Sequence, residues 1–250
     1  MSELRIGRVA ELWRYPVNGL QGEKLDQVRV LRHGFTGDHL YAIRDIASGR
    51  VLDPKSYQFS WGESVGRPSM LELAARISGP PEGSHSILIE TSGQSLTWSS
   101  ERDVNERLSG FLGGKLELVR FPRFAEARVR SGRTLHLLTT ASLSRMKEVY
   151  PRGDFQSRRF RPNIVVETDS GVDGFVEDGW IGKDVLAGSV RIHVEKSNVR
   201  CKVTTMSQPG IAEDPGILES IERGNNSSLG VMCTALQEGE LRVGDPVRLS

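Results

Sequence analysis

The sequence predicts a mainly β fold of the α+β kind, with a few short helices. Short runs of apolar and β-branched residues recur along the chain, separated by turns rich in Gly, Asp and Asn. The chain has 27 glycines in 250 residues, which favours tight turns between short strands. Apolar residues follow helical spacing over only a few segments, so helices should be a minor part of the fold.

In the first half of the chain, apolar and polar residues alternate weakly over residues 6–12. Strands are expected where apolar residues alternate between turns, at residues 24–31, 40–44, 71–77 and 116–119. Residues 87–89 and 95–98 flank a Ser-Gly-Gln turn and predict a hairpin. A helix is expected from Ser100 until Gly113-Gly114, which supply its end.

The second half of the chain predicts further strands and two helices. The strands are expected at residues 135–138, 164–166, 229–236 and 240–249, with several shorter ones within 175–203. The first helix should cover residues 143–150 and stop before Pro151. The second helix should have Asp214 as its N-cap, Pro215 at its first position and Gly224 just after its end.

Composition excludes several classes of protein. The net charge is +1, so no overall field attracts nucleic acid or an acidic membrane. No apolar run approaches the ~18 residues of a membrane span, and the first ten residues lack the apolar core of a signal peptide. A cytoplasmic protein is therefore expected, in which Cys201 and Cys233 are free thiols. Without a CxxC pair a structural zinc site is not expected, whereas a disulfide stays open on the sequence alone.

Cys201 is the candidate reactive residue. It lies between Arg200 and Lys202, and neighbouring cations favour the thiolate, the form that binds metals and attacks substrates. Cys233 lies in the apolar run 230–236 with no adjacent cation, which predicts a buried, inert thiol. The five histidines show no metal-binding spacing.

Residues 139–142 predict a corner at which a strand meets a helix. Backbone N–H groups without helical partners can bind an anion there, and Thr140 or Ser142 could add a hydroxyl. The alternative, which the spacing alone favours, is that Thr140 is only the N-cap of the helix.

A dense basic run covers residues 158–163. Pro162 is expected to hold Arg161 in an extended conformation directly before a buried strand. A guanidinium held in this way suits bidentate binding of a phosphate. An ion pair of Arg161 with Glu167 or Asp169 is an equal alternative on the sequence alone.

Four segments resemble the MOSC domain in order and spacing: residues 161–166, 177–182, 200–205 and 244–247. Residues 15–38 resemble the β domain that precedes it in molybdenum cofactor sulfurases and in the amidoxime-reducing proteins of mitochondria and their bacterial relatives. The resemblance implies a MOSC β-barrel at residues 126–250 and a smaller N-terminal β-rich domain at residues 1–125. The basic segment 120–133, which has poor periodicity, marks the candidate boundary.

The resemblance also implies a site. In the reductases of the family, a pterin-bound molybdenum lies between the two domains with a cysteine thiolate on the metal, and Cys201 matches that cysteine. The residues expected to contact this molybdenum cofactor are Arg161, Asn163, Thr140, Ser142 and Arg200. Two expected cofactor positions depart from the family pattern, because Asn18 stands in place of a lysine and His39 in place of an arginine. A neutral histidine attracts a phosphate less than arginine does.

Three functions follow from this resemblance. The chain could be a molybdenum-dependent oxidoreductase that reduces a small N-oxygenated substrate with electrons from a separate protein. It could carry sulfur or the cofactor on Cys201, or it could bind another small anionic ligand instead of the cofactor. Cys201 and Arg161 favour the first two functions, whereas Asn18 and His39 favour the third. Pyridoxal phosphate is not expected, because nothing here resembles the aminotransferase-like domain of full sulfurases.

Overall fold

A computed structural model describes residues 4–54, 69–91, 94–96, 101–120 and 134–250. The predicted mainly β fold is confirmed. The strands are β1 (Leu4–Arg14), β2 (Glu23–Leu25), β3 (Gln27–Leu31), β4 (Gly34–Phe35), β5 (Tyr41–Asp45), β6 (Leu73–Ser78), β7 (Ser86–Thr91), β8 (Gln94–Leu96), β9 (Leu116–Arg120), β10 (Leu135–Thr139), β11 (Ile164–Thr168), β12 (Asp184–Ala187), β13 (Val190–Val199), β14 (Ser228–Gln237), β15 (Gly239–Arg242) and β16 (Pro246–Leu249). The α-helices are α2 (Glu101–Leu112), α4 (Thr140–Val149) and α5 (Gly216–Asn225), and the 3-10 helices are η1 (Met70–Glu72), η2 (Ser157–Phe160), η3 (Val176–Trp180) and η4 (Lys202–Thr205).

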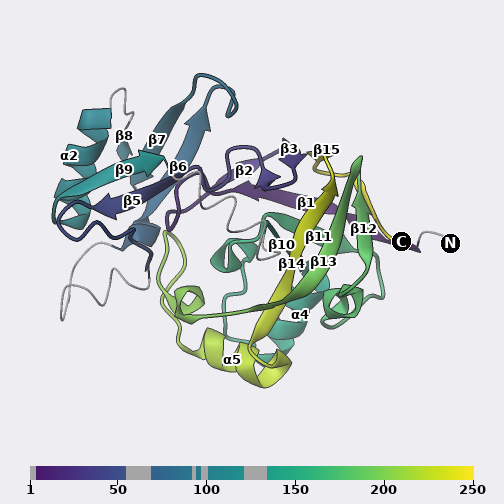
Figure 1. Cartoon of the computed structure of the whole chain (residues 1–250). Helices are drawn as coiled ribbons and strands as arrows, with labels where there is room; N and C mark the ends of the chain where they lie inside the picture. Colours follow the sequence, from purple (N-terminus) through teal and green to yellow (C-terminus); the bar gives the residue numbers. More distant parts are fainter. Residues whose placement is uncertain (1–3, 55–68, 92–93, 97–100, 121–133) are drawn as a thin grey trace.

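A β-barrel occupies the right-hand part of the molecule in Figure 1. Its strands follow the order β11-β10-β14-β13-β12-β16-β1, and β1 closes the ring by pairing with both β16 and β11. Neighbouring strands are antiparallel apart from the parallel pair β10–β11. A small sheet of order β15-β3-β4 accompanies the barrel, and β2 extends from β1.

The weak alternation of residues 6–12 has a structural cause. The pairing of β1 with β16 shifts between Arg5 and Gly7, and its pairing with β11 shifts between Val9 and Glu11. Each shift breaks the two-residue period of a strand. The strand therefore bends around the barrel, and its apolar residues do not follow one strict pattern.

The barrel interior is filled by apolar side chains from the closing strands. Among them are Leu12, Leu137, Val166, Ile192, Val231 and Val247. Cys233 belongs to this core and has no exposed surface, and burial raises the pKa of its thiol. The prediction of a buried, inert Cys233 is thus consistent with its position.

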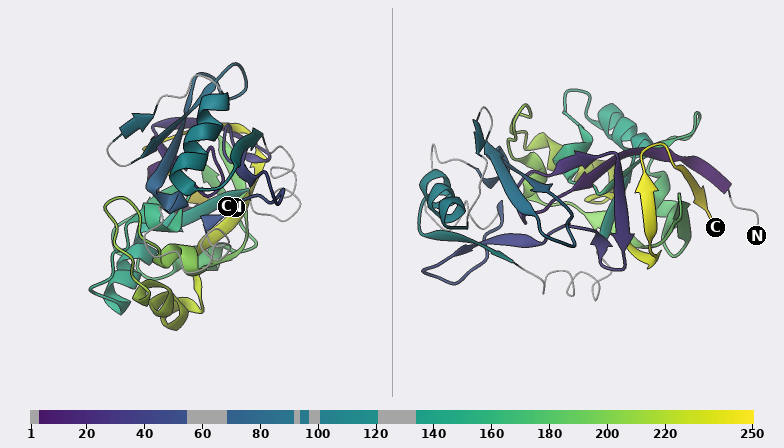
Figure 2. Two further views of the ribbon diagram at one scale, coloured as in Figure 1. Left: turned by 90° about the vertical axis from the view of Figure 1, so that its left-hand side faces the viewer. Right: turned by 90° about the horizontal axis from the view of Figure 1, so that it is seen from above.

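A second β-rich part contains the strand pair β5–β9, the sheet β6-β7-β8 and helix α2. It has its own core, which includes Ile43, Leu73, Ile89, Leu108 and Leu116, and it lies beside the barrel in Figures 1 and 2. Strands β1 and β2 belong to the sheet of the barrel, and β3 and β4 pair with β15 in the small sheet beside it. The boundary between residues 125 and 126 stays a prediction, since most of the segment 120–133 lies outside the described residues.

Helices α4 and α5 cover the lower side of the barrel in Figure 1. They share a third core with the strand residues Leu138 and Leu229, to which Met146, Phe160 and Ile217 contribute. Within the described part of the chain, no helix is both long enough and apolar enough to cross a membrane.

Several helix ends differ by one or two residues from the prediction. The N-cap of α4 is Thr139, not Thr140, because the Thr139 side chain accepts from the backbone N–H of Ser142. The N-cap of α5 is Pro215, and Asp214 assists it by accepting from the N–H of Gly216. This helix ends at Asn226 in the left-handed conformation and not at Gly224.

Two predicted strands are interrupted. Residues 24–31 form β2 and β3, and residues 240–249 contain β15 and β16, between which Gly244 turns with a φ of 92°. The run 71–77 begins with the 3-10 helix η1, because Ser69 and Glu72 form a reciprocal capping box there.

The close approach of β14 to β10 predicts a specific sensitivity. Gly230 has a φ of +77°, and a Cβ there would lie 2.7 Å from the carbonyl oxygen of Leu137 and 2.4 Å from Nε2 of His136. We expect Gly230→Ala to lower the free energy of unfolding by about 2 kcal/mol or more. Urea denaturation would measure this loss.

Gly110→Ala is the matched control. Gly110 lies in α2, and no neighbouring atom of the described residues lies within 4 Å of the position that a Cβ would take there. This substitution should instead stabilise the protein by about 0.5–1 kcal/mol, because alanine loses less backbone entropy than glycine in a helix. Equal effects of the two substitutions would contradict the role assigned to Gly230.

Candidate functional site

Three segments that lie far apart in the sequence are fastened to one another by side-chain hydrogen bonds. They are residues 15–22, residues 157–161 and residues 200–214, which we call the thiol loop because it carries Cys201. We refer to the three segments together as the clamp.

Arg161 joins residues 157–161 to residues 15–22. Its Nη1 donates to the carbonyl of Leu20 at 2.6 Å, and its Cζ lies 4.2 Å from the centre of the Tyr15 ring. The predicted extended conformation is wrong, because Arg161 ends η2 in the left-handed region with a φ of 54° and donates its N–H to Arg158. The side chain is held, as expected, but by these contacts and not by Pro162.

The other arginines of the basic run hold the thiol loop. Arg159 is 1% exposed, and its guanidinium donates to the carbonyls of Asp154 at 2.9 Å, Thr204 at 3.0 Å and Ala212 at 2.9 Å. Arg158 adds a bond of 2.7 Å from its Nη2 to the carbonyl of Pro209. The run is therefore not a solvated basic face. The acids expected as alternative partners of Arg161 pair with other arginines, Glu167 with Arg8 and Asp169 with Arg5.

Cys201 is exposed and is a free cysteine. Its carbonyl accepts from both the N–H and the hydroxyl of Thr204, which fixes the backbone at the start of η4. The neighbouring Arg200 points inward, where its Nη2 donates to the carbonyl of Phe160 at 2.7 Å. Burial, followed by repulsion from Arg161, lowers the pKa of Arg200 to about 10, so this guanidinium is still charged at neutral pH.

His136 lies behind Arg161. Its Nδ1 lies 3.2 Å from the carbonyl of Arg161, which requires a proton on Nδ1, and its Nε2 is buried without a hydrogen-bond partner among the described residues. Burial and the charge of Arg200 lower the pKa of His136 to about 3. The ring is therefore neutral and supports the left-handed backbone of Arg161.

Buried polar atoms without a partner gather around the clamp. In the part of the chain that the structure describes there are four such side-chain atoms, and three of them are His136 Nε2, Arg200 Nε and Gln208 Nε2. Buried donors and acceptors in folded proteins usually have partners, supplied by protein, water or a ligand. Two of the three, Arg200 Nε and Gln208 Nε2, belong to the thiol loop itself.

Other predicted site residues have side chains that bond within the protein. The hydroxyl of Ser142 donates to Glu177 at 2.7 Å, and the Thr140 hydroxyl contacts that of Thr168 at 3.3 Å. Glu177 also accepts from the Thr139 hydroxyl at 2.7 Å, and burial raises the pKa of its carboxyl group. The anion position expected at this corner is thus filled by a carboxyl group of the chain.

Asn163 is 2% exposed and joins two strands. Its Oδ1 accepts from the N–H of His136 at 3.0 Å, and its Nδ2 donates to the carbonyl of Trp13 at 3.2 Å. In this position the amide fastens β10 to β1, close to Arg161 in sequence.

The two departures from the family pattern lie in the first segment and beside it. Asn18 donates its N–H to the carbonyl of Tyr41. His39 is left-handed with a φ of 53°, and its Nδ1 lies 2.8 Å from Oδ2 of Asp38. Asp38 also accepts from the N–H of Tyr15, so His39 is linked to the segment that carries the ring under Arg161.

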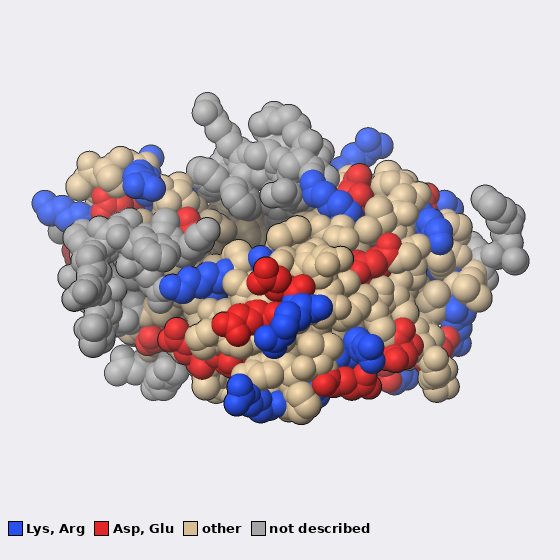
Figure 3. Space-filling model, turned by 90° about the horizontal axis from the view of Figure 1, so that it is seen from below, with Lys and Arg blue, Asp and Glu red and all other residues tan. Residues whose placement is uncertain are grey.

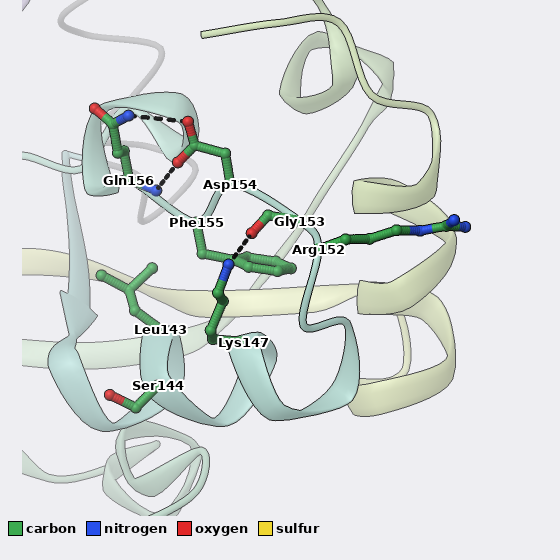
Figure 4. A pocket seen from close by; sticks show the side chains of 8 residues that line it. All are labelled: Leu143, Ser144, Lys147, Arg152, Gly153, Asp154, Phe155 and Gln156. Atoms are coloured by element: carbon green, nitrogen blue, oxygen red, sulfur yellow. Dashed lines mark hydrogen bonds between the residues drawn. The ribbon is translucent and has the colours of Figure 1, made fainter.

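A surface pocket of about 580 Å³ lies elsewhere, between α4 and residues 152–156 (Figure 4). In this pocket Lys147 donates to the carbonyl of Gly153 at 2.9 Å, and the Arg152 side chain points away. Positive and negative side chains are interleaved over the face shown in Figure 3. Among the arginines of the clamp, Arg159 is buried, whereas Arg158, Arg161 and Arg200 are half-buried.

Sequence reasoning missed Arg159 and the pair Gln21 and Gln208. Gln21 donates to Gln208 at 2.8 Å, which joins residues 15–22 directly to the thiol loop. Glutamine carries no sequence signal for such a bond, because its partner is 187 residues away. The density of the basic run was a usable signal for Arg159, but it did not show which arginine turns inward.

The neutral state of His136 predicts a pH dependence of stability. Below pH 6.5 the unfolded chain takes up a proton that the folded chain takes up only near pH 3, so stability falls as the pH falls through this window. We expect His136→Gln, which can still donate to Arg161, to remove about 1 to 1.5 kcal/mol of the stability difference between pH 7.5 and pH 5.5. Urea denaturation at both pH values would measure it.

The raised pKa of Glu177 acts in the opposite direction, since its stabilising proton is lost as the pH rises. The variant comparison is therefore needed to isolate His136. His33→Gln, which removes an exposed histidine, is the control and should keep the pH dependence of the unaltered protein. An unchanged pH dependence in His136→Gln would contradict the neutral, buried ring.

Comparison with known proteins agrees with this architecture. The chain is 24% identical to mitochondrial amidoxime-reducing component 1 of Mus musculus over 289 aligned residues, which cover 98% of this chain and 83% of that protein. The structure also aligns with the crystal structure of the YuaD protein from Bacillus subtilis, with a TM-score of 0.51 and 10% sequence identity. The alignment covers 99% of this chain and 98% of the YuaD chain, so the two proteins share a fold. The family model of the MOSC domain matches residues 123–248, about half of the sequence. The chain therefore belongs to the MOSC domain family.

Proposed function

We propose that this protein binds the molybdenum cofactor at the clamp and reduces small N-oxygenated substrates with electrons from a separate protein. The observation that carries the proposal is the position of Cys201, an exposed thiol at the start of a loop that two buried or half-buried arginines hold in place. The resemblance of the chain to an amidoxime-reducing component supports the choice of reaction.

The residues of the clamp fit both the metal and the phosphate group of such a cofactor. A thiolate is a soft ligand that suits molybdenum better than a carboxylate would. The guanidinium groups of Arg161 and Arg200 suit an anionic phosphate group. Arg200 Nε and Gln208 Nε2 are buried donors without a partner among the described residues, as expected where a polar ligand completes the structure.

In the proposed reaction the chain itself binds and orients. When bound, the cofactor would supply two-electron redox chemistry, by which the N-oxygenated substrate loses its oxygen as water with two electrons from the donor protein and two protons. Cys201 would hold the metal at the exposed edge of the thiol loop, where a small substrate can reach it. Arg159 and Thr204 would keep that loop fixed, because they bond to it at its carbonyl groups.

A second function is favoured by the residues that are already engaged. Ser142 and Asn163 bond to the protein, and Asn18 and His39 replace two cations of the family pattern. These features would lower the affinity for a large pterin cofactor and favour a smaller anionic ligand at the arginines. Transport of sulfur or of the cofactor on Cys201 would need the same exposed thiol.

The first test of the proposal is the substitution Cys201→Ser. We expect it to remove molybdenum from protein made in a cofactor-producing host, because it removes the proposed thiolate ligand. The melting temperature should change by less than about 2 °C, because the thiol is exposed. Elemental analysis and calorimetry would measure both quantities.

Cys233→Ser is the matched control. It places a hydroxyl in the barrel core, so it should lower the melting temperature but keep the metal in the folded fraction. Unaltered protein without molybdenum would overturn the proposed metal site. Cyanide-labile sulfur on Cys201 would favour the carrier function instead.

The second test is His39→Arg. Arginine carries a permanent positive charge, which histidine does not, and it could form an ion pair with Asp38. We expect slower loss of molybdenum during dialysis. His33→Arg adds the same charge at an exposed turn and should change nothing. Unchanged or faster loss in His39→Arg would contradict a role of this position in cofactor binding.

A further inference from the structure

The carboxamide groups of Gln21 and Gln208 have a fixed orientation. Nε2 of Gln21 donates to the carbonyl of Leu71 at 3.1 Å and to Oε1 of Gln208 at 2.8 Å. A reversed Gln21 amide would place its oxygen against the Leu71 carbonyl oxygen, which is unfavourable because both groups accept. Gln208 must therefore present its oxygen to Gln21 and turn its Nε2 away from it.

This Nε2 is a donor without an acceptor. Gln208 is 5% exposed, and its Nε2 has no hydrogen-bond partner among the residues that the structure describes. A buried donor in this state destabilises the fold unless something else accepts its hydrogen bonds. A long flexible side chain would turn outward if it had no role here, but the bond to Gln21 holds it inside.

The backbone also holds Gln208 in place. Its N–H donates to the carbonyl of Ile211 at 2.9 Å, and the N–H of Ile211 donates back at 2.8 Å. Between them Pro209 and Gly210 form a tight turn, in which Gly210 has a φ of +72°. The donor is therefore presented from a rigid turn of the thiol loop.

The Gln208 amide lies where residues 15–22 contact the thiol loop, and we call this contact the seam. Gln21 directly follows Leu20, whose carbonyl accepts from Arg161 Nη1 at 2.6 Å. Gln208 also follows Cys201 by seven positions in the loop that Arg158 and Arg159 hold. Gln208 is thus tied to the segment that Arg161 contacts and belongs to the loop that carries Cys201.

We propose that Gln208 is a ligand-binding residue of the Cys201 site, and that its Nε2 donates a hydrogen bond to an oxygen acceptor of the anionic ligand. This assignment rests on the proposed function, because the ligand is the one that the arginines of the clamp bind. Gln21 is a positioning residue in this arrangement, since it sets which end of the Gln208 amide faces the ligand.

The test uses the near-isosteric substitution Gln208→Glu. A carboxylate oxygen can still accept from Gln21, so the seam stays joined, but the donor is replaced by a negatively charged acceptor that repels the ligand. The full-length chain would be made in a cofactor-producing host and its molybdenum and phosphorus contents measured. Protection of Cys201 from iodoacetamide by inorganic phosphate would be titrated in the same samples. The control is Gln237→Glu, which makes the same charge change at an exposed end of β14.

We expect Gln208→Glu to weaken retention of the ligand roughly tenfold or more, while the control behaves as the unaltered protein. Equal molybdenum in all three proteins would overturn the assignment of Gln208 and leave the proposed function standing. If the unaltered protein holds no molybdenum, the proposed function fails, and the phosphate titration then decides whether Gln208 binds an anionic ligand. Weaker protection in Gln208→Glu alone would then support the assignment, and equal or absent protection would overturn it. Should Gln208→Glu not fold, Gln208→Met, which removes the donor without adding charge, is judged by the same outcomes.

Discussion

The buried guanidinium of Arg159 is the constraint on which the candidate site depends. A charged group inside a protein is costly unless hydrogen bonds compensate for its lost hydration. Arg159 meets this requirement with three backbone carbonyls, one before η2 and two in the thiol loop. The loop has little regular structure of its own beyond η4, so these bonds decide where its backbone lies. The position of Cys201, three residues before Thr204, follows from them.

Four arginines in or near η2 each donate to a backbone carbonyl of another segment. Arg158 and Arg159 donate to the thiol loop, Arg161 donates to Leu20, and Arg200 returns from the thiol loop to Phe160. Each uses a neutral carbonyl as its acceptor in these bonds, so the positive charges are positioned without being neutralised by them. This differs from the exposed pairs of the barrel surface, such as Arg8 with Glu167, where a carboxylate is the partner.

The sequence was a good guide to the elements and a partial guide to the site. Alternation and turn residues predicted most strands, because a strand that faces a core on one side has a two-residue period. The two-residue period did not predict β1 well, because two shifts in its pairing bend the strand. It also did not predict the turns that divide residues 24–31 and 240–249 into two strands each. Motif resemblance predicted Cys201 and Arg161 to belong to one site, and the structure joins their segments through the bond from Arg200 to Phe160. It could not show that Ser142 faces Glu177, because a hydroxyl beside a helix start serves a ligand or a buried acid equally well.

The charges of the site suggest an order in what it selects. Burial lowers the pKa of Arg200, and the nearby positive charge of Arg161 adds to this effect, so the two guanidinium groups repel each other. An anion that binds there relieves this repulsion, and the gain does not depend on the shape of the rest of the ligand. In the proposed site, the shape of the ligand would be selected by the ring of Tyr15 and by the backbone of Arg161, which is left-handed. In the proposed site, charge would therefore favour the entry of an anion, and the contact between the thiol loop and residues 15–22 would select which ligand stays.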